Sequence, residues 1–230
     1  MKKIWFDIED KDRNIMTMGF SINNCCLFGW AGRNKEEVRK HAEELAEHGI
    51  RGPKNMPEYF LCSPNVITHD EEITVVGDGT CGEIEFFFLE RQGNIYVGVT
   101  SEHTDRVLES IDMVKSKAIC QKPMSTKLWR YEDIKDHWDE LELIAWQIKD
   151  GEEVLYQKSK LSALLTLESI REEALKTYST LEDCIILSGT IPALNGLIYG
   201  SHFRGCLKDP VLNRSLEFEY DIKVVPSNEQ

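Results

Sequence analysis

A pair of glutamates on an otherwise apolar strand constrains the fold more than any other part of the chain. Residues 82–89 read Gly-Glu-Ile-Glu-Phe-Phe-Phe-Leu, and a second apolar run, 94–100, follows after Gln92-Gly93. Two apolar runs with a Gly-containing turn between them predict a β-hairpin. Because strand residues alternate between the two faces of a sheet, Glu83 and Glu85 are expected on the same face.

The pairing register of this hairpin decides which residues meet on the carboxylate face. If Gln92-Gly93 forms the turn, Glu83 lies opposite Glu102; if the turn moves on by one residue, Glu85 lies opposite Glu102. In either register three carboxylates converge, with directly opposed Cβ atoms about 5 Å apart. Like charges this close repel each other unless a cation lies among them. The pattern therefore predicts a divalent metal, Mg²⁺ or Mn²⁺ with Ca²⁺ as a third option. The alternative is a solvated strand face with scattered glutamates.

The composition is that of an acidic globular protein. The chain has 230 residues, 41% of them hydrophobic, and a formal net charge of -13. No repeat or linker divides it, so residues 1–230 are expected to form a single domain. The negative charge argues against a nucleic acid or a membrane as a partner, and no signal peptide or transmembrane stretch is evident. Seven cysteines without a CxxC pair predict reduced thiols in a cytoplasmic protein.

Short apolar runs separated by turns predict an α+β chain with more strand than helix. Strands are expected near residues 4–8, 26–30, 83–89, 94–100, 140–149, 153–156, 184–187 and 216–225. A helix is expected from Lys35 to about His48 with Asn34 as its N-cap, and another from Ser159 to Tyr178. Residues 107–114 fit either a helix or a strand. So many short strands favour a mixed β-sandwich or roll with flanking helices.

Several motifs resemble those of the fumarylacetoacetate hydrolase family, in the same order. Glu83-Ile84-Glu85 resembles its E-x-E pair, and Glu102 to Arg106 resembles its D-x-[ST]-x-R segment, with glutamate in place of aspartate. Lys117 stands where the family has a lysine ahead of a Cys-Pro element, although Lys115 and Lys122 compete for that place. Ser188 to Pro192 resembles the family's T-G-T-P turn with an isoleucine inserted. The whole chain looks like a bacterial branch of this family.

The resemblance also extends to a helix upstream of the hairpin. Gly32-Arg33-Asn34 resembles the G-R-N that opens the helix bearing the family's His-x-x-Glu pair, which falls here on His41 and Glu44. A carboxylate that orients an imidazole suits a general base, whereas the alternative is an ordinary pair on the surface of a Glu-rich helix. His103 follows Glu102 and is expected on the opposite face, in a structural role.

The resemblance implies a role for each matched residue. The metal ligands are expected to be Glu83, Glu85 and Glu102. The catalytic pair is expected to be His41 and Glu44. The substrate is expected to contact Arg106, Lys117 and Thr190.

The resemblance further implies the fold of the fumarylacetoacetase C-terminal domain and a class of reaction. The expected activity is metal-dependent hydrolysis of a C–C bond in a small 2-oxo acid or 1,3-dicarbonyl compound, such as an acylpyruvate, through a metal-stabilised enolate. Decarboxylation or tautomerisation of an oxo acid at the same site is the first alternative. A non-catalytic protein that binds a metal or a carboxylate is the second. Members of this family are commonly homodimers, so a homodimer is expected.

Overall fold

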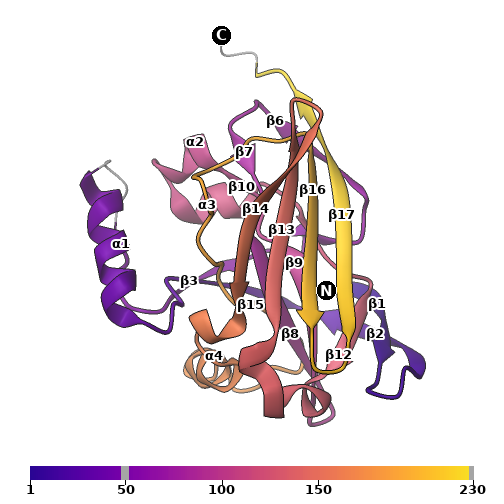
Figure 1. Cartoon of the computed structure of the whole chain (residues 1–230). Helices are drawn as coiled ribbons and strands as arrows, with labels where there is room; N and C mark the ends of the chain where they lie inside the picture. The colour runs from indigo at the N-terminus through magenta and orange to yellow at the C-terminus, as the bar shows by residue number, and fades with distance from the viewer. Residues whose placement is uncertain (48–51, 228–230) are drawn as a thin grey trace.

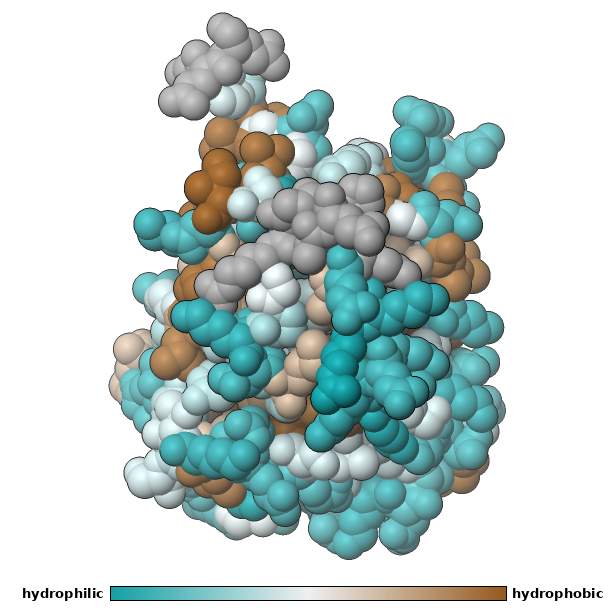
Figure 2. Space-filling view, turned by 90° about the vertical axis from the view of Figure 1, so that its left-hand side faces the viewer, coloured by the Kyte–Doolittle hydropathy of each residue, from teal (hydrophilic) through white to brown (hydrophobic). Residues whose placement is uncertain are grey.

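The computed structural model describes residues 1–47 and 52–227 and places most of them in strands. Two large sheets lie face to face, and short helices flank them (Figure 1). This arrangement is the predicted α+β roll. Within the described residues no helix is both long and apolar enough to cross a bilayer. Hydrophilic side chains cover much of the face that Figure 2 shows, with hydrophobic ones between them.

The larger sheet has eight strands in the order β2-β1-β12-β9-β8-β15-β3-β4. In that order the strands are Ile15–Ile22, Lys2–Glu9, Lys127–Arg130, Asn94–Ser101, Ile84–Arg91, Cys184–Leu187, Asn24–Gly29 and Glu58–Cys62. The β1–β12 and β15–β3 pairs are parallel, and the other neighbours are antiparallel. The predicted hairpin, β8 with β9, therefore lies at the centre of this sheet.

The smaller of the two large sheets has five strands in the order β14-β13-β16-β17-β6. In that order the strands are Glu152–Lys160, Glu142–Lys149, His202–Asp209, Arg214–Val225 and Glu72–Val76. Two short pairs complete the strands: β7 (Thr80–Cys81) with β10 (Thr104–Asp105), and β5 (Ile67–Thr68) with β11 (Lys122–Pro123). The β7–β10 pair lies beside the carboxylate end of the hairpin.

The helices of the described chain are short and lie at the edges of the sheets. They are α1 (Lys35–Glu47), α2 (Arg106–Glu109), α3 (Met113–Ala118) and α4 (Leu167–Ala174). Single 3₁₀ turns span Pro64–Val66, Tyr131–Asp133, Lys135–Glu140 and Leu161–Ala163. The predicted cap of α1 is confirmed, because the Asn34 side chain accepts a hydrogen bond from the Glu36 amide at 3.1 Å. Helix α1 stands away from the sheets on the side where α2 and α3 lie (Figure 1).

The hairpin adopts the first of the two expected registers. Arg91 pairs with Asn94, and Gln92 and Gly93 form the turn with φ values of 51° and 76°. Positive φ at both turn residues matches the right-handed twist of the two strands. At the open end of the hairpin, just before β8 and just after β9, the Glu102 amide donates to the Glu83 carbonyl at 2.8 Å. Glu83 therefore lies opposite Glu102.

Strand β8 is buried on both faces, which explains its continuous apolar run. Phe86 and Phe88 belong to the hydrophobic core between the two large sheets. Phe87 points the other way, into a second core that includes Phe6 and Leu27. A strand covered on both sides has no solvent face, so it carries apolar residues at successive positions rather than at alternate ones.

The helix predicted from Ser159 to Tyr178 is wrong over its first half. Strand β14 continues to Lys160, which pairs with Glu142 on β13. Only Leu167–Ala174 forms an α-helix, and its cap is Thr166, whose hydroxyl accepts from the Ser169 amide at 3.2 Å. Pairing with β13 outweighs the helix propensity of the segment, which is a weak preference of a few tenths of a kcal/mol per residue. Residues 107–114 fall mainly in helices α2 and α3, so their helical alternative holds.

Gly98 is the position at which the packing of this hairpin is tightest. It lies opposite Phe87, and a Cβ placed there would come within 2.6 Å of Leu128 Cδ2 and closer still to the Phe87 ring. We expect Gly98→Ala to lower the free energy of unfolding by about 1–3 kcal/mol, as overpacking of a filled core does. Urea denaturation would measure the loss. Gly93→Ala offers a comparison, because Gly93 has no neighbour within 4 Å and its cost comes from its φ of 76° instead.

Candidate metal and carboxylate site

The predicted carboxylates gather at the open end of the hairpin. Glu85 lies within β8, Glu83 just before that strand, and Glu102 just after β9. Helix α3 brings Lys117 to the same place, and α2 brings Arg106. Five charged groups from segments up to 34 residues apart thus share one buried region.

Lys117 forms an ion pair with Glu102. Its ammonium donates to Glu102 Oε2, and both residues are buried, with 6% and 2% of their surface exposed. The ammonium also lies 5.9 Å from the centre of the Phe60 ring. Burial alone would lower the pKa of Lys117, but the carboxylates of Glu102, Glu83 and Glu109 outweigh it and raise that pKa above its ordinary value. Lys117 is therefore a permanent cation.

Arg106 holds Glu83 from the other side. Its guanidinium lies 3.0 Å from Glu83 Oε2 and 2.8 Å from Glu109 Oε2, and its Nε donates to Cys81 Sγ at 3.0 Å. Burial opposes ionisation of Glu83, yet Arg106 and Lys117 lower its pKa below the ordinary value. Glu83 is therefore ionised, and Arg106 is paired with carboxylates of the protein itself.

Glu85 is the one of the three predicted ligands that forms no ion pair with Lys117 or Arg106. Its Oε2 accepts a hydrogen bond from the Gly189 amide at 3.0 Å. Burial and the neighbouring Glu102 raise the pKa of Glu85 well above its ordinary value, and Lys117 only partly offsets them. Glu85 Oε1 and Glu102 Oε1 are both buried without a hydrogen-bond partner. Two buried oxygens of this kind cost stability unless a further group binds them.

These oxygens fit a hard divalent ion. Mg²⁺, Mn²⁺ and Ca²⁺ prefer carboxylate oxygens, and two such atoms in the cluster lack partners. Among the side chains that the structure describes, no three acidic, imidazole or thiol groups are gathered tightly enough to hold a metal. Arg106 pairs with Oε2 of Glu83, and Lys117 pairs with Oε2 of Glu102. Two of the three predicted ligands therefore present a free oxygen, and Glu83 is engaged by Arg106.

A tight turn closes the site above Glu85. Gly189 has φ 82°, and a Cβ there would lie 3.1 Å from the Phe28 carbonyl oxygen, so both the backbone and the space require glycine. The Thr190 hydroxyl donates to the Ile84 carbonyl at 2.8 Å and accepts from Gln157 Nε2 at 2.9 Å. This clamp fixes the turn against β8 and aims the Gly189 amide at the Glu85 carboxyl.

A comparison with known protein families identifies the family of this chain. The sequence profile of a family described as "Protein of unknown function (DUF2848)" matches residues 28–220. The chain belongs to the DUF2848 family. No curated protein sequence matches it.

Solved structures show which fold this DUF2848 chain has. "Crystal structure of Cg1458 with inhibitor" is 19% identical, with a TM-score of 0.65 over 93% of this chain and 81% of that one. A 2-keto-3-deoxy-D-arabinonate dehydratase complexed with magnesium and 2,5-dioxopentanoate is 17% identical, with a TM-score of 0.62 over 90% and 75%. Fumarylacetoacetate hydrolase from psychrophilic Exiguobacterium antarcticum is 12% identical, with a TM-score of 0.60 over 92% and 79%. The predicted fumarylacetoacetate hydrolase fold is confirmed.

Two further residues near the site of this DUF2848 chain are structural. His103 is fully buried between the hydroxyls of Tyr220 and Thr80, each 2.9 Å from a ring nitrogen. Burial lowers the pKa of His103 to about 3, so the ring is neutral. The Lys122 ammonium is also buried and contacts the backbone carbonyls of His103 and Lys117. Burial lowers the pKa of Lys122.

Of the three candidate lysines, only Lys117 contacts a predicted ligand. Lys122 binds carbonyl groups, and Lys115 is exposed, with its ammonium 3.3 Å from Asp112 Oδ2. The side chains of His41 and Glu44 lie outside the described residues, so the predicted pair has only a backbone position, in α1. Its roles remain predictions.

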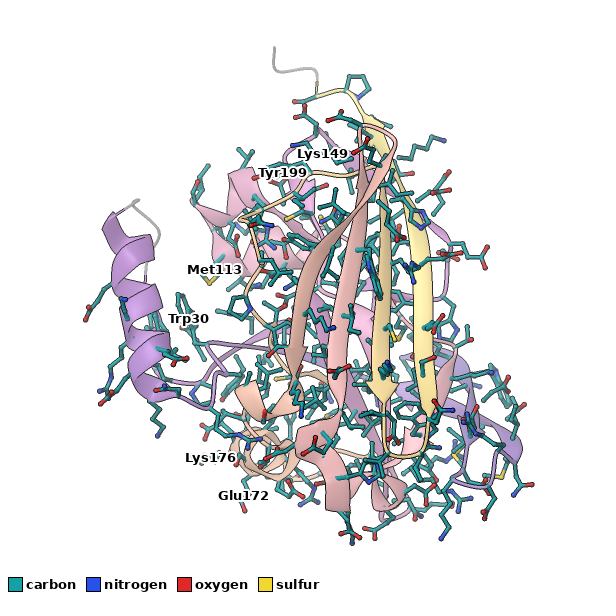
Figure 3. All side chains as sticks on the ribbon, viewed as in Figure 1. Trp30, Met113, Lys149, Glu172, Lys176 and Tyr199 are labelled. Atoms are coloured by element: carbon teal, nitrogen blue, oxygen red, sulfur yellow. The ribbon has the colours of Figure 1, made fainter. Side chains whose placement is uncertain are left out.

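Sequence reasoning missed two residues that the fold brings in. Gln157 clamps the Thr190 turn but lies in a polar run of β14 that has no distinguishing pattern. Tyr199 lies on the loop beside α2 (Figure 3), close enough to Cys81, Arg106 and Glu109 for their charges to act on its hydroxyl. Burial is the main cause of its raised pKa. A lone tyrosine in a loop carries no sequence signal for such a position.

Proposed function

We propose that this protein is a divalent-metal-dependent hydrolase that cleaves a C–C bond in a small 2-oxo acid or 1,3-dicarbonyl compound. The observation that carries the proposal is the pair of buried, unpartnered oxygens on Glu85 and Glu102 beside a permanent cation, Lys117. A metal-free protein gains nothing from such a pair, whereas a metal site requires it. The dehydratase with this fold that is complexed with magnesium and 2,5-dioxopentanoate supports the same class of ligand.

In the proposed chemistry, the metal and the protein side chains have different roles. Mg²⁺ or Mn²⁺, when bound to Glu83, Glu85 and Glu102, supplies a Lewis acid for the substrate's oxygens. Lys117 would place positive charge where the enolate oxygen develops. The substrate contact proposed for Thr190 would use its backbone amide, because its hydroxyl donates to Ile84 and the Gly189 amide donates to Glu85. Arg106 keeps Glu83 ionised and oriented, so its contribution to substrate binding passes through that carboxylate.

Helix α1 is the proposed source of the general base. His41, oriented by Glu44, would take a proton from the attacking water. Trp30 directly follows β3, and Met113 begins α3. Both lie on the side of the body that faces α1 (Figure 3). A substrate held against Lys117 and covered from this side would be shielded from bulk water. The expected homodimer and cytoplasmic location remain predictions.

An activity screen tests the proposal directly. The full-length protein, first stripped with a chelator and then supplied with Mg²⁺ or Mn²⁺, would be incubated with acylpyruvates, β-keto acids, 3-deoxy-2-oxo acids and β-diketones. We expect metal-dependent loss of the enol absorbance and release of two acids from an acylpyruvate. Release of CO2, tautomerisation or dehydration without hydrolytic release of two acids would replace hydrolysis by one of those reactions. No turnover of any substrate with either metal would overturn the proposal.

Lys117→Met tests the assignment of the site lysine. Loss of a positive group that faces developing negative charge is expected to lower kcat/KM by about 100- to 1000-fold. Lys115→Met is the matched control, because Lys115 lies two residues away with an exposed side chain and should leave turnover unchanged. Melting curves of both variants would show that they are folded. Full activity in a folded Lys117→Met would remove Lys117 from the site, and an equal loss in both variants would show that the effect is not specific to Lys117.

A further inference from the structure

Two thiols face each other across neighbouring strands beside the carboxylate site. Cys25 on β3 pairs directly with Cys62 on β4 in an antiparallel ladder. Directly opposed residues have Cα atoms about 4.5–5.5 Å apart, within the range of about 4.4–6.8 Å that a disulfide requires. Both side chains pack against the same hydrophobic core, so they point to the same face of the sheet. Both are free thiols.

We propose that Cys25 and Cys62 are a modification site that closes reversibly into a disulfide, with Cys62 reacting first. Cys62 is partly exposed, whereas Cys25 has 1% of its surface exposed. Cys62 is therefore the more accessible of the two to an oxidant, and Cys25 is the resolving thiol. This order of access is the usual arrangement of a redox-sensitive pair.

The charges around the pair favour the same order. A side-chain hydrogen bond with Cys25 lowers the pKa of Cys62, and the ammonium groups of Lys122 and Lys117 lower it further. Burial and the Glu102 carboxylate oppose them, and the net pKa of Cys62 is lowered. The same hydrogen bond and burial raise the pKa of Cys25. Because the thiolate is the nucleophile, Cys62 is the more reactive of the two.

The reaction balances with a peroxide as the oxidant. The Cys62 thiolate attacks one oxygen of hydrogen peroxide and the O–O bond breaks, which leaves a sulfenic acid and releases hydroxide. The Cys25 thiol then attacks the sulfenic sulfur, the S–S bond forms and water leaves. Two thiols and one peroxide thus give one disulfide and two waters. The two sulfurs are oxidised, and the peroxide is reduced.

Strand β4 connects this pair to the carboxylate site. Phe60 lies two residues before Cys62 and therefore on the same face of β4, and its ring lies 5.9 Å from the Lys117 ammonium. Lys117 in turn holds Glu102. A disulfide that shifts β4 against β3 would move the support of Lys117. This coupling rests on the proposed function, whereas formation of the disulfide does not.

Thiol counting on the full-length protein tests the proposal without any assay of activity. The protein would be treated with equimolar hydrogen peroxide, denatured, alkylated and weighed by mass spectrometry. The reduced chain takes up seven alkyl groups, and the oxidised chain should take up five, because the disulfide uses two of the seven cysteines. Dithiothreitol should restore all seven. Fragment spectra of the wild type should locate the cross-link between Cys25 and Cys62.

Single variants provide the controls. Cys62→Ala should retain all six remaining thiols after peroxide, whereas Cys25→Ala should form no disulfide and lose only the Cys62 thiol, because its sulfenic acid has no resolving partner. Cys26→Ala is the matched control, because Cys26 lies next to Cys25 but faces the opposite core; it should still lose two thiols. The proposal is overturned if the wild type keeps seven thiols, or if Cys62→Ala still loses two thiols to peroxide. Loss of turnover with an intact dithiol would concern the proposed function alone.

Discussion

Glu85→Gln is expected to abolish Mg²⁺ binding while leaving the metal-free protein as stable as the wild type. Burial and the neighbouring Glu102 raise the pKa of Glu85, so the metal-free carboxyl tends to hold a proton. A neutral amide of the same shape then changes the free energy of unfolding by about 1 kcal/mol or less, the net worth of one hydrogen bond. The same change removes a charged ligand, so affinity for Mg²⁺ or Mn²⁺ should fall at least about 100-fold.

Calorimetric titration with Mn²⁺ and urea denaturation of the metal-free protein would measure the two effects. Glu90→Gln is the matched control, because Glu90 lies on the same strand but is paired with Arg171, 2.6 Å away. Its metal affinity should equal that of the wild type. Unchanged Mn²⁺ affinity in Glu85→Gln would rule out Glu85 as a ligand. A large loss of stability without metal would show that the carboxyl is ionised in the folded protein.

Asp209→Asn is expected to lower the free energy of unfolding by about 3–5 kcal/mol, the usual cost of leaving a buried charge without its partner. Asp209 is fully buried, and its carboxylate accepts from Arg214 Nε at 3.3 Å. It also lies 3.0 Å from His137 Nε2 and accepts from the Leu212 amide at 3.0 Å. The Arg214 side chain is itself fully buried and stacks on Trp129 at 4.4 Å. The variant leaves this guanidinium without its nearest anion.

The same carboxylate predicts a dependence on pH. Burial alone would raise the pKa of Asp209, but the Leu212 amide, His137 and Arg214 together lower it. Its contribution to stability is therefore complete above the unfolded-state pKa of about 3.9 and is lost as pH falls through the lower pKa of the folded state. The difference between the wild type and Asp209→Asn should be largest at neutral pH and shrink below about pH 4.

An exposed carboxylate provides the comparison for this prediction. Asp221 pairs with His202 at 2.8 Å, but its side chain is 70% exposed. Surface ion pairs contribute about 0–1 kcal/mol, so Asp221→Asn should be nearly neutral in urea denaturation at pH 7. Equal losses in Asp209→Asn and Asp221→Asn would contradict a role for burial.

The candidate site was predictable where its geometry is local. The alternation of β8 and the Gln92-Gly93 turn are enough to bring Glu83 opposite Glu102, and the structure has this register. The charge balance of the cluster was not predictable. Repulsion among three carboxylates indicated that a cation lies among them. Lys117 and Arg106 supply part of that positive charge. Their approach depends on how α2 and α3 fold back, which no spacing in the sequence reveals.

The secondary structure was likewise predictable where it depends on local sequence and not where it depends on contacts between distant residues. The strands at residues 84–91 and 94–101 were predicted because their apolar pattern and turn residues lie within a few positions of each other. The start of the helix predicted at Ser159 was wrong, because the partner of that segment is β13. Strand pairing is a contact between distant residues, and it outweighs a local preference for helix.

By itself, the sequence determined the hairpin, its two faces and the acidic cluster at its end, because side-chain alternation and turn chemistry act over a few residues. The tertiary structure alone decided which carboxyl lacks a cation. Glu85 meets the Gly189 amide across 104 positions of sequence, and Glu102 meets Lys117 only through the placement of α3. Cys25 and Cys62 likewise become neighbours through the pairing of β3 with β4. Such contacts arise from the order of strands in the sheet, which depends on the packing of the whole chain.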